Sequence, residues 1–90
     1  MRLELTGALD GKEVARYYHQ LNRQLVVGGG LELSLAGVTG VDSTSVALLV
    51  SLARLAKAKQ CRLSIKSIPA SLRRLIVVAR LSELLPIVDG

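Results

Sequence analysis

Three stretches of alternating apolar and polar residues are each followed by a stretch of helical periodicity, and this order constrains the fold more than any other feature of the sequence. Residues 2–9, 31–38 and 61–68 alternate with a period of two, which is typical of half-buried strands. Apolar residues recur every three or four positions over 12–27 and from 42 to 59, which predicts two amphipathic helices. This order of strands and helices predicts a small α/β domain.

The last third of the chain continues the same order. Pro69 ends the third strand and, together with Ser71, predicts the start of a final helix that reaches Ser82. Residues 86–88 are expected to add a short extended piece. Because each connection contains a helix, we expect the last two strands to pair in parallel through right-handed crossovers.

Length and composition limit the class of protein. Ninety residues are enough for one domain, so residues 1–90 are expected to form a single unit. Cys61 is the only cysteine, which excludes an internal disulfide and favours a reducing, cytoplasmic location. No apolar run approaches the roughly 20 residues of a membrane-spanning helix, and the first residues do not resemble a signal peptide.

Charge is distributed unevenly along the sequence. Residues 1–42 contain four Lys/Arg and five Asp/Glu, whereas residues 43–82 contain eight Lys/Arg and no acidic residue. A surface with this asymmetry attracts an acidic partner, which can be a protein, a phosphate, a lipid headgroup or a nucleic acid. The alternative is a basic face that is only solvated.

Catalytic and metal-binding patterns are absent from the sequence. His19 is the only histidine, and a triad with Ser43 lacks the G-x-S-x-G context of a nucleophile. One cysteine and one histidine are too few for a zinc site. Gly28-Gly29-Gly30 leads from a helix into a strand, which is the reverse of a phosphate-binding loop. The sequence therefore predicts a protein that is not an enzyme and that needs no cofactor or metal.

The strongest candidate site is the run Asp42-Ser43-Thr44-Ser45 at the start of the long second helix. The first amides of a helix lack intrahelical partners and its dipole is positive there, so three hydroxyls at this place can bind an acidic group of a partner or accept a phosphoryl group. The alternative is that these residues only cap the helix.

A second candidate is an apolar stripe on the same helix, formed by Leu48, Leu52 and Leu55. At 100° per residue it extends the apolar arc to roughly 220°, which is wider than a helix needs against its own sheet. We expect this stripe to be exposed and to dock a partner. The alternative is that a neighbouring helix, such as residues 72–79, covers it.

Two segments resemble a known family. LTGALD at residues 5–10 resembles the L-x-G-x-L-D strand end of STAS domains, the family of the anti-sigma-factor antagonists. VDSTSVALL at residues 41–49 resembles that family's signature of an apolar residue, Asp, Ser or Thr, any residue, Gly and then apolar residues. Within the family, residues 46–57 and the Leu84-Leu85-Pro86 ending are most similar to the STAS subunit of the Mla phospholipid-transport complex.

This resemblance implies an α/β STAS-like domain with a mixed sheet and helices packed against it. It also implies a non-enzymatic subunit that binds the cytoplasmic ATPase of an ABC transporter, at the inner membrane of a Gram-negative envelope, and supports its assembly and activity. In the antagonists the hydroxyl that corresponds to Ser43 is phosphorylated, and in the transporter subunit it lies at the ATPase contact.

The chain departs from the family pattern at three places. Ser45 stands where members usually have glycine, and Ser34 stands where the antagonists often have an aspartate that supports phosphorylation. The family also has a strand before LTGALD, so either the sequence starts late or the sheet has lost that edge strand. The loss of the acid favours the transporter subunit, and the alternatives are an antagonist phosphorylated at Ser43 or a binder of nucleic acid or anionic lipid.

Overall fold

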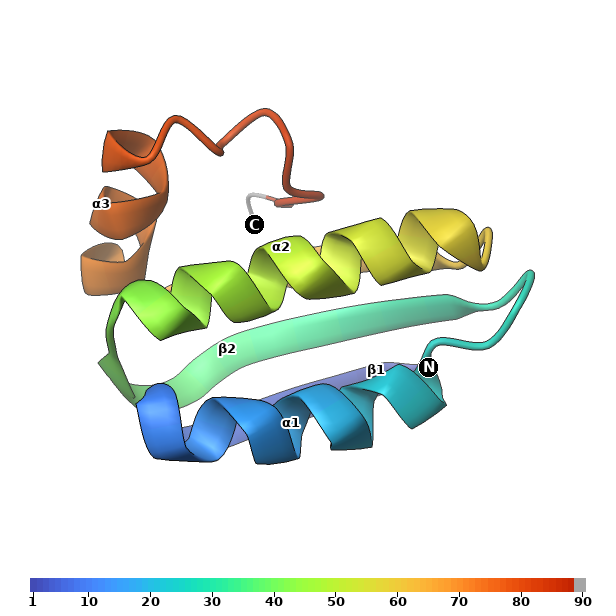
Figure 1. The fold of residues 1–90 in the computed structure, drawn as a ribbon, viewed down its shortest axis with the longest axis horizontal. Helices are drawn as coiled ribbons and strands as arrows, with labels where there is room; N and C mark the ends of the chain where they lie inside the picture. Colours follow the sequence, from blue (N-terminus) through green and yellow to red (C-terminus); the bar gives the residue numbers. More distant parts are fainter. Residues whose placement is uncertain (89–90) are drawn as a thin grey trace.

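Every strand of the protein is followed by a helix, as the sequence predicts. The computed structural model describes residues 1–88. The elements occur in the order β1 (Arg2–Leu9), α1 (Gly11–Gln24), β2 (Gly30–Val41), α2 (Ser43–Ala58), β3 (Arg62–Lys66) and α3 (Ala70–Val78), shown in Figure 1.

The three strands form one sheet in the order β1-β2-β3, and both pairings are parallel. Leu3 lies opposite Leu33, and Leu31 lies opposite Leu63. The α/β class is confirmed, but within residues 1–88 the sheet is parallel rather than mixed. The reason is that both connections between its strands contain a helix that returns the chain to the end where the previous strand began.

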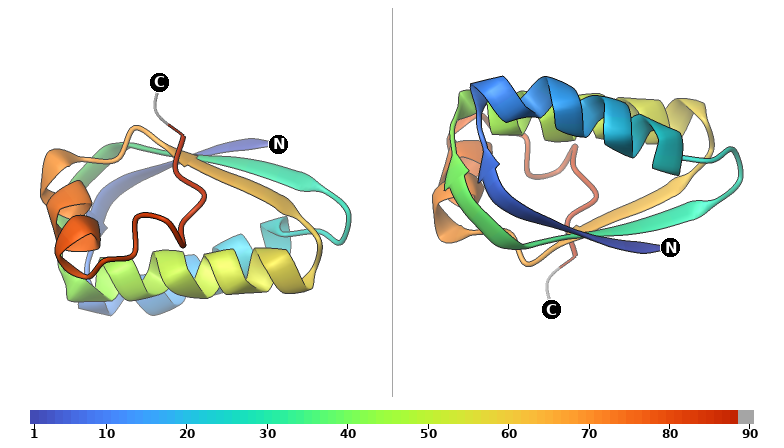
Figure 2. Two further views of the ribbon diagram at one scale, coloured as in Figure 1. Left: turned by 90° about the horizontal axis from the view of Figure 1, so that it is seen from above. Right: turned by 90° about the horizontal axis from the view of Figure 1, so that it is seen from below.

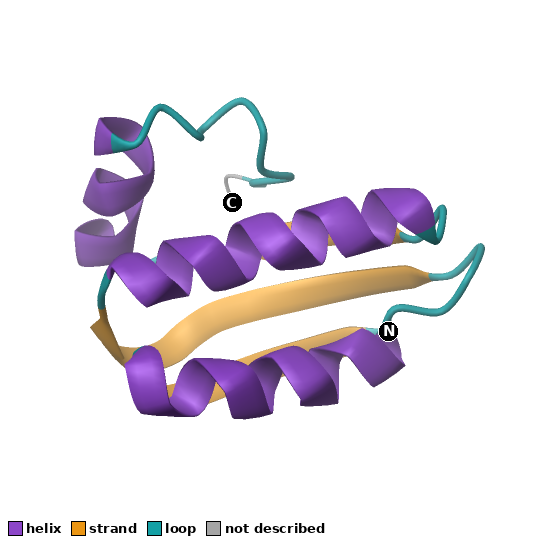
Figure 3. Cartoon of the chain, viewed as in Figure 1, coloured by secondary structure: helices purple, strands orange, loops and turns teal. Residues whose placement is uncertain are grey.

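The helices form a layer on one face of this sheet, which Figure 3 separates by colour from the strands. α1 and α2 lie side by side over that face, and α3 stands next to the start of α2 (Figure 2). The Tyr17 hydroxyl donates a hydrogen bond of 2.7 Å to the Thr6 carbonyl, which fastens α1 to β1. Among residues 1–88, the outer edge of β1 is paired with no other strand.

Leucine supplies most of the core, because the chain has only two aromatic residues. Full burial of one leucine side chain stabilises the fold by roughly 1.5–3 kcal/mol. Strands and helices both contribute fully buried leucines, among them Leu9, Leu21, Leu33, Leu35 and Leu49.

The opposite face of the sheet is polar. Glu32 on the central strand forms ion pairs with Arg2 of β1 at 2.6 Å and with Lys66 of β3 at 3.2 Å. The hydrogen bond from Arg2, followed by that from Lys66, lowers the pKa of Glu32 below its ordinary value. Because these groups are solvated, their contribution to stability is small.

Some element boundaries differ from the predicted ones. α1 ends at Gln24 rather than near residue 27, since Leu25 already has an extended backbone. β2 continues past residue 38 to Val41 because it keeps pairing with β1. This pairing requires a residue without a side chain at Gly37, where a Cβ atom would lie 2.7 Å from the Thr6 methyl group.

The final helix is shorter than predicted. α3 ends at Val78 instead of Ser82, because Arg80 adopts a φ of 60° and the Leu81 amide bonds back to the Ile76 carbonyl at 3.0 Å. This is a Schellman-type ending. Ser71 forms no cap, since α3 begins after Pro69 without a side-chain cap. The extended piece at residues 86–88 is confirmed, because Ile87 forms a parallel bridge with Ile65 of β3.

Candidate functional site

The start of α2 lies at the carboxyl end of the parallel sheet, where α1 also begins. Asp42 caps α2, and its carboxylate accepts a hydrogen bond of 2.8 Å from the Thr44 amide. The Thr44 hydroxyl donates to the same oxygen. This hydroxyl is the main cause that lowers the pKa of Asp42 below 3.8, and the amides of Thr44 and Gly11 add to it. The ionised carboxylate therefore stabilises the starts of both helices.

Ser45 is part of the interior. Its side chain is 0% exposed, and its hydroxyl donates to the Leu9 carbonyl and accepts from the Asp42 amide at 3.1 Å. The predicted role of Ser45 in partner binding is wrong, because its hydroxyl completes the capping box and joins α2 to the end of β1. A glycine at this position cannot form either bond.

Ser43 is the accessible hydroxyl of the run. It is exposed at the first position of α2, and its hydroxyl bonds to no other residue within 1–88. Thr44 is half-buried, with its hydroxyl engaged by Asp42. Of the four predicted residues, the structure therefore places two in the cap, one in the interior and only Ser43 at the surface with a free hydroxyl.

The leucine stripe of α2 is not a surface feature. Leu48 and Leu52 are 2% and 1% exposed, and Leu55 is half-buried against the core. The prediction of an exposed stripe is wrong because α1 packs along α2 on the same face of the sheet (Figure 1). A neighbouring helix does cover the stripe, but it is α1 rather than residues 72–79.

A groove separates α1 from α2 and reaches the start of α2 at Thr44. Its volume is about 360 Å³, and α1 and α2 line it with Gly11, Val14, Ala15, Tyr18, His19, Thr44, Ala47, Leu48 and Ser51. We call it the α1 groove. It stays open because the residues of α2 that follow Ser43 at four-residue intervals, Ala47 and Ser51, are small and exposed. Sequence reasoning missed this groove, although the four-residue spacing of small side chains was a visible signal.

The chemistry available at the α1 groove is that of a docking surface. It offers the exposed hydroxyl of Ser51, apolar contacts at Val14 and Ala47, and an aromatic ring at Tyr18. The accessible hydroxyl of Ser43 lies outside the lining, one helical turn before Ala47. His19 stands at its edge with its ring 6.1 Å from that of Tyr18. Within residues 1–88, no three His, Cys, Asp or Glu side chains gather into a potential metal site. Nor does any helix of this part of the chain have the length and apolar character to cross a bilayer.

Comparison with known proteins identifies the relatives of the chain. The family model described as "Mlab, STAS domain" matches residues 1–87. No curated protein matches. The structure of the anti-sigma factor antagonist SpoIIAA in its unphosphorylated form is similar, with a TM-score of 0.77 and 17% identity over 99% of this chain and 77% of that chain. At this level of identity the likeness establishes the fold alone.

Proposed function

The chain belongs to the STAS domain family, and from this premise we propose that it is a non-enzymatic accessory subunit that docks on the cytoplasmic ATPase of an ABC-type phospholipid transporter of the Mla pathway. STAS domains mediate protein–protein interactions. The family model whose description names Mlab covers residues 1–87 and supports this assignment over other roles of the fold. In this role the chain is held at the cytoplasmic side of the inner membrane through its partner.

The observation that carries the proposal is the contrast at the start of α2. Asp42 and Ser45 are engaged in capping, whereas Ser43 is exposed one helical turn before Ala47, which lines the α1 groove. The small side chains of Ala47 and Ser51 allow a partner backbone to approach α2 closely. A partner segment in the groove would bury apolar surface on Val14, Tyr18 and Ala47 and could reach the Ser43 hydroxyl, while the cap keeps α2 rigid.

The experiment is co-purification with the ABC ATPase of an Mla-type transporter from the same organism. Ser43→Arg places a long cation one helical turn before Ala47 of the groove, and we expect it to abolish the complex. Ala58→Arg is the matched control, because Ala58 is an exposed small residue at the other end of α2. The control should bind as the wild-type chain does. Full binding by Ser43→Arg overturns the site, and no complex with the wild-type chain overturns the function.

A second candidate function is an anti-sigma-factor antagonist that is phosphorylated on Ser43. The similarity to SpoIIAA and the exposure of the Ser43 hydroxyl favour it. The helix N-terminus stabilises a phosphate, which also favours this alternative. Incubation with an anti-sigma kinase and ATP tests this alternative. One added phosphate on the wild-type chain and none on Ser43→Ala would support it, and an unchanged intact mass would remove it.

A further inference from the structure

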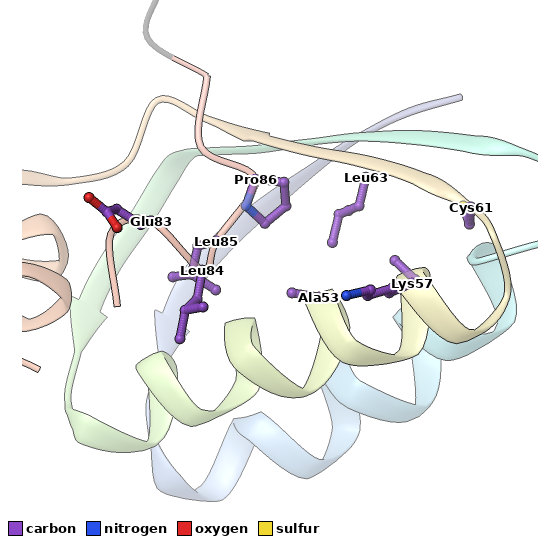
Figure 4. A pocket seen from close by; sticks show the side chains of 9 residues that line it. Ala53, Lys57, Cys61, Leu63, Glu83, Leu84, Leu85 and Pro86 are labelled. Atoms are coloured by element: carbon purple, nitrogen blue, oxygen red, sulfur yellow. The ribbon is translucent and has the colours of Figure 1, made fainter. Parts of the chain in front are cut away.

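Residues 81–86, which follow α3, run along the other side of α2 from α1 (Figure 1). A second groove lies between these residues and α2. It consists of two hollows of about 280 and 290 Å³. Both hollows are lined by Ala53, Lys57, Leu84 and Leu85, so they lie next to each other. We call this surface the C-terminal groove, and Figure 4 shows the hollow nearer β3.

The outer wall of the C-terminal groove is held in place by the sheet. Leu85 is buried, and the Ile65 amide of β3 donates a hydrogen bond of 2.9 Å to the Pro86 carbonyl. The Val88 amide donates in turn to the Ile65 carbonyl at 2.8 Å. The wall is therefore anchored on both sides of Pro86, and the groove exists before any ligand arrives.

Aliphatic side chains line both hollows of the C-terminal groove. Val50 and Ala53 of α2 face Leu81 across the hollow nearer α3. Leu84 stands in the wall between the two hollows and is 70% exposed. Figure 4 shows the side chain of Leu63 on β3 directed into the second hollow from the sheet side. These aliphatic surfaces favour a ligand with aliphatic side chains.

The α2 rim of the C-terminal groove is basic. Arg54 and Lys57 are exposed, and neither forms an ion pair with another residue of 1–88. The stretch from residue 43 to residue 82 contains no acid that could neutralise them. Glu83 is the one acidic side chain among those that line the two hollows, and it lines only the hollow nearer β3.

We propose that the C-terminal groove binds an acidic amphipathic segment of a partner protein. Aliphatic side chains of this segment fill the two hollows, and its carboxylates pair with Arg54 and Lys57. The positive rim selects against basic segments and accelerates the encounter with acidic ones. A bilayer surface fits less well, because the apolar surface is recessed between α2 and its wall and the chain has no Trp or Phe to anchor it in lipid.

The test uses the isolated chain and two synthetic peptides of about 14 residues, or four helical turns, with Leu at helical spacing. One peptide carries Glu at the remaining positions and the other carries Lys. NMR titration of the isotope-labelled chain should give shifts concentrated at Val50, Ala53 and Leu84. We expect the Glu peptide to bind at least about tenfold more tightly than the Lys peptide, and less tightly as salt is added.

Paired variants test the charge argument directly. Arg54→Glu with Lys57→Glu should reverse the preference between the peptides. Arg23→Glu with Arg62→Glu changes the net charge by the same amount at exposed positions outside the groove and should leave the preference unchanged. Thermal unfolding confirms that both variants fold.

Three outcomes would overturn the proposal: equal affinity for the two peptides, shifts spread over the basic surface in general, or the same shifts with phosphatidylglycerol vesicles and none with the Glu peptide. The ATPase takes no part in this experiment, so its failure leaves the proposed function standing.

Discussion

The two flanks of α2 offer different chemistry on one rigid element. The α2 side of the α1 groove is made of small residues at Ala47 and Ser51, and no Lys, Arg, Asp or Glu is among the residues that line it. The C-terminal groove is lined by aliphatic side chains and has a basic rim at Arg54 and Lys57. The protein therefore has one surface that allows close approach of a partner backbone and a separate surface that attracts acidic groups. The first flank suits a tight, shape-determined contact, and the second suits charge steering.

The largest effect should come from a core side chain of α2 beside the α1 groove. Leu48 is a buried core residue of α2. Leu48→Ala should therefore lower the free energy of unfolding by about 2–5 kcal/mol, as large-to-small core substitutions do. Leu84→Ala removes the same atoms from an exposed position and should change it by no more than about 0.5 kcal/mol. Urea unfolding measures both, and equal losses would mean that Leu48 is not a core residue.

The second-largest effect on the free energy of unfolding should come from the cap at the start of α2. Ser45→Ala removes the hydroxyl bonds to the Leu9 carbonyl and the Asp42 amide and should cost about 1–3 kcal/mol of unfolding free energy. Ser43→Ala should cost under about 0.5 kcal/mol, because that hydroxyl is exposed. If the two substitutions had the same effect on stability, the division between a structural and an accessible hydroxyl would be wrong.

These two comparisons also show what sequence reasoning could reach. The order of the elements followed from local periodicity, and the hydroxyl run was placed correctly at the start of α2. The burial of Leu48 and Leu52 could not be predicted, since a helical wheel describes one helix and does not say which neighbour lies beside it. Ser45 was missed for the same reason, because its partner Leu9 is 36 positions away in the chain.

The loop conformations and the strand pairing outside the periodic stretches could not be predicted from the sequence either. The early end of α3 depends on the left-handed backbone of Arg80, a conformation that the sequence did not signal. The hollows of the C-terminal groove depend on the bridge between Ile87 and Ile65, which is a long-range contact. Local patterns therefore predicted which elements form, and tertiary contacts decided which of their surfaces stay open.

Acid should weaken the start of α2 through Asp42. Its pKa in the folded chain lies below 3.8, so its contribution to stability is complete above that pH and is lost as the pH falls from 3.8 through the folded pKa. Asp42→Asn keeps an oxygen for the Thr44 amide but cannot titrate. We expect the acid-induced loss of unfolding free energy to be shallower in this variant. An unchanged pH profile of the unfolding free energy would show that the Asp42 carboxylate does not stabilise the start of α2.

The smallest effect on stability should come from the basic rim. Because Arg54 and Lys57 are exposed and unpaired within the described residues, Arg54→Glu with Lys57→Glu should change the unfolding free energy by less than about 0.5 kcal/mol. The same substitution should reverse the charge preference of the C-terminal groove. A large loss of stability would mean that the rim serves the fold rather than binding.

The central claim, that the start of α2 and the α1 groove receive the ATPase, is tested most directly by site-specific photo-cross-linking. A photoreactive residue replaces Ala47 in the α1 groove or, as the control, Arg62 on the exposed start of β3. The account predicts a cross-link to the ATPase from position 47 and none from position 62. A cross-link from position 62 alone, or from neither position in a chain that still binds the ATPase, would contradict it.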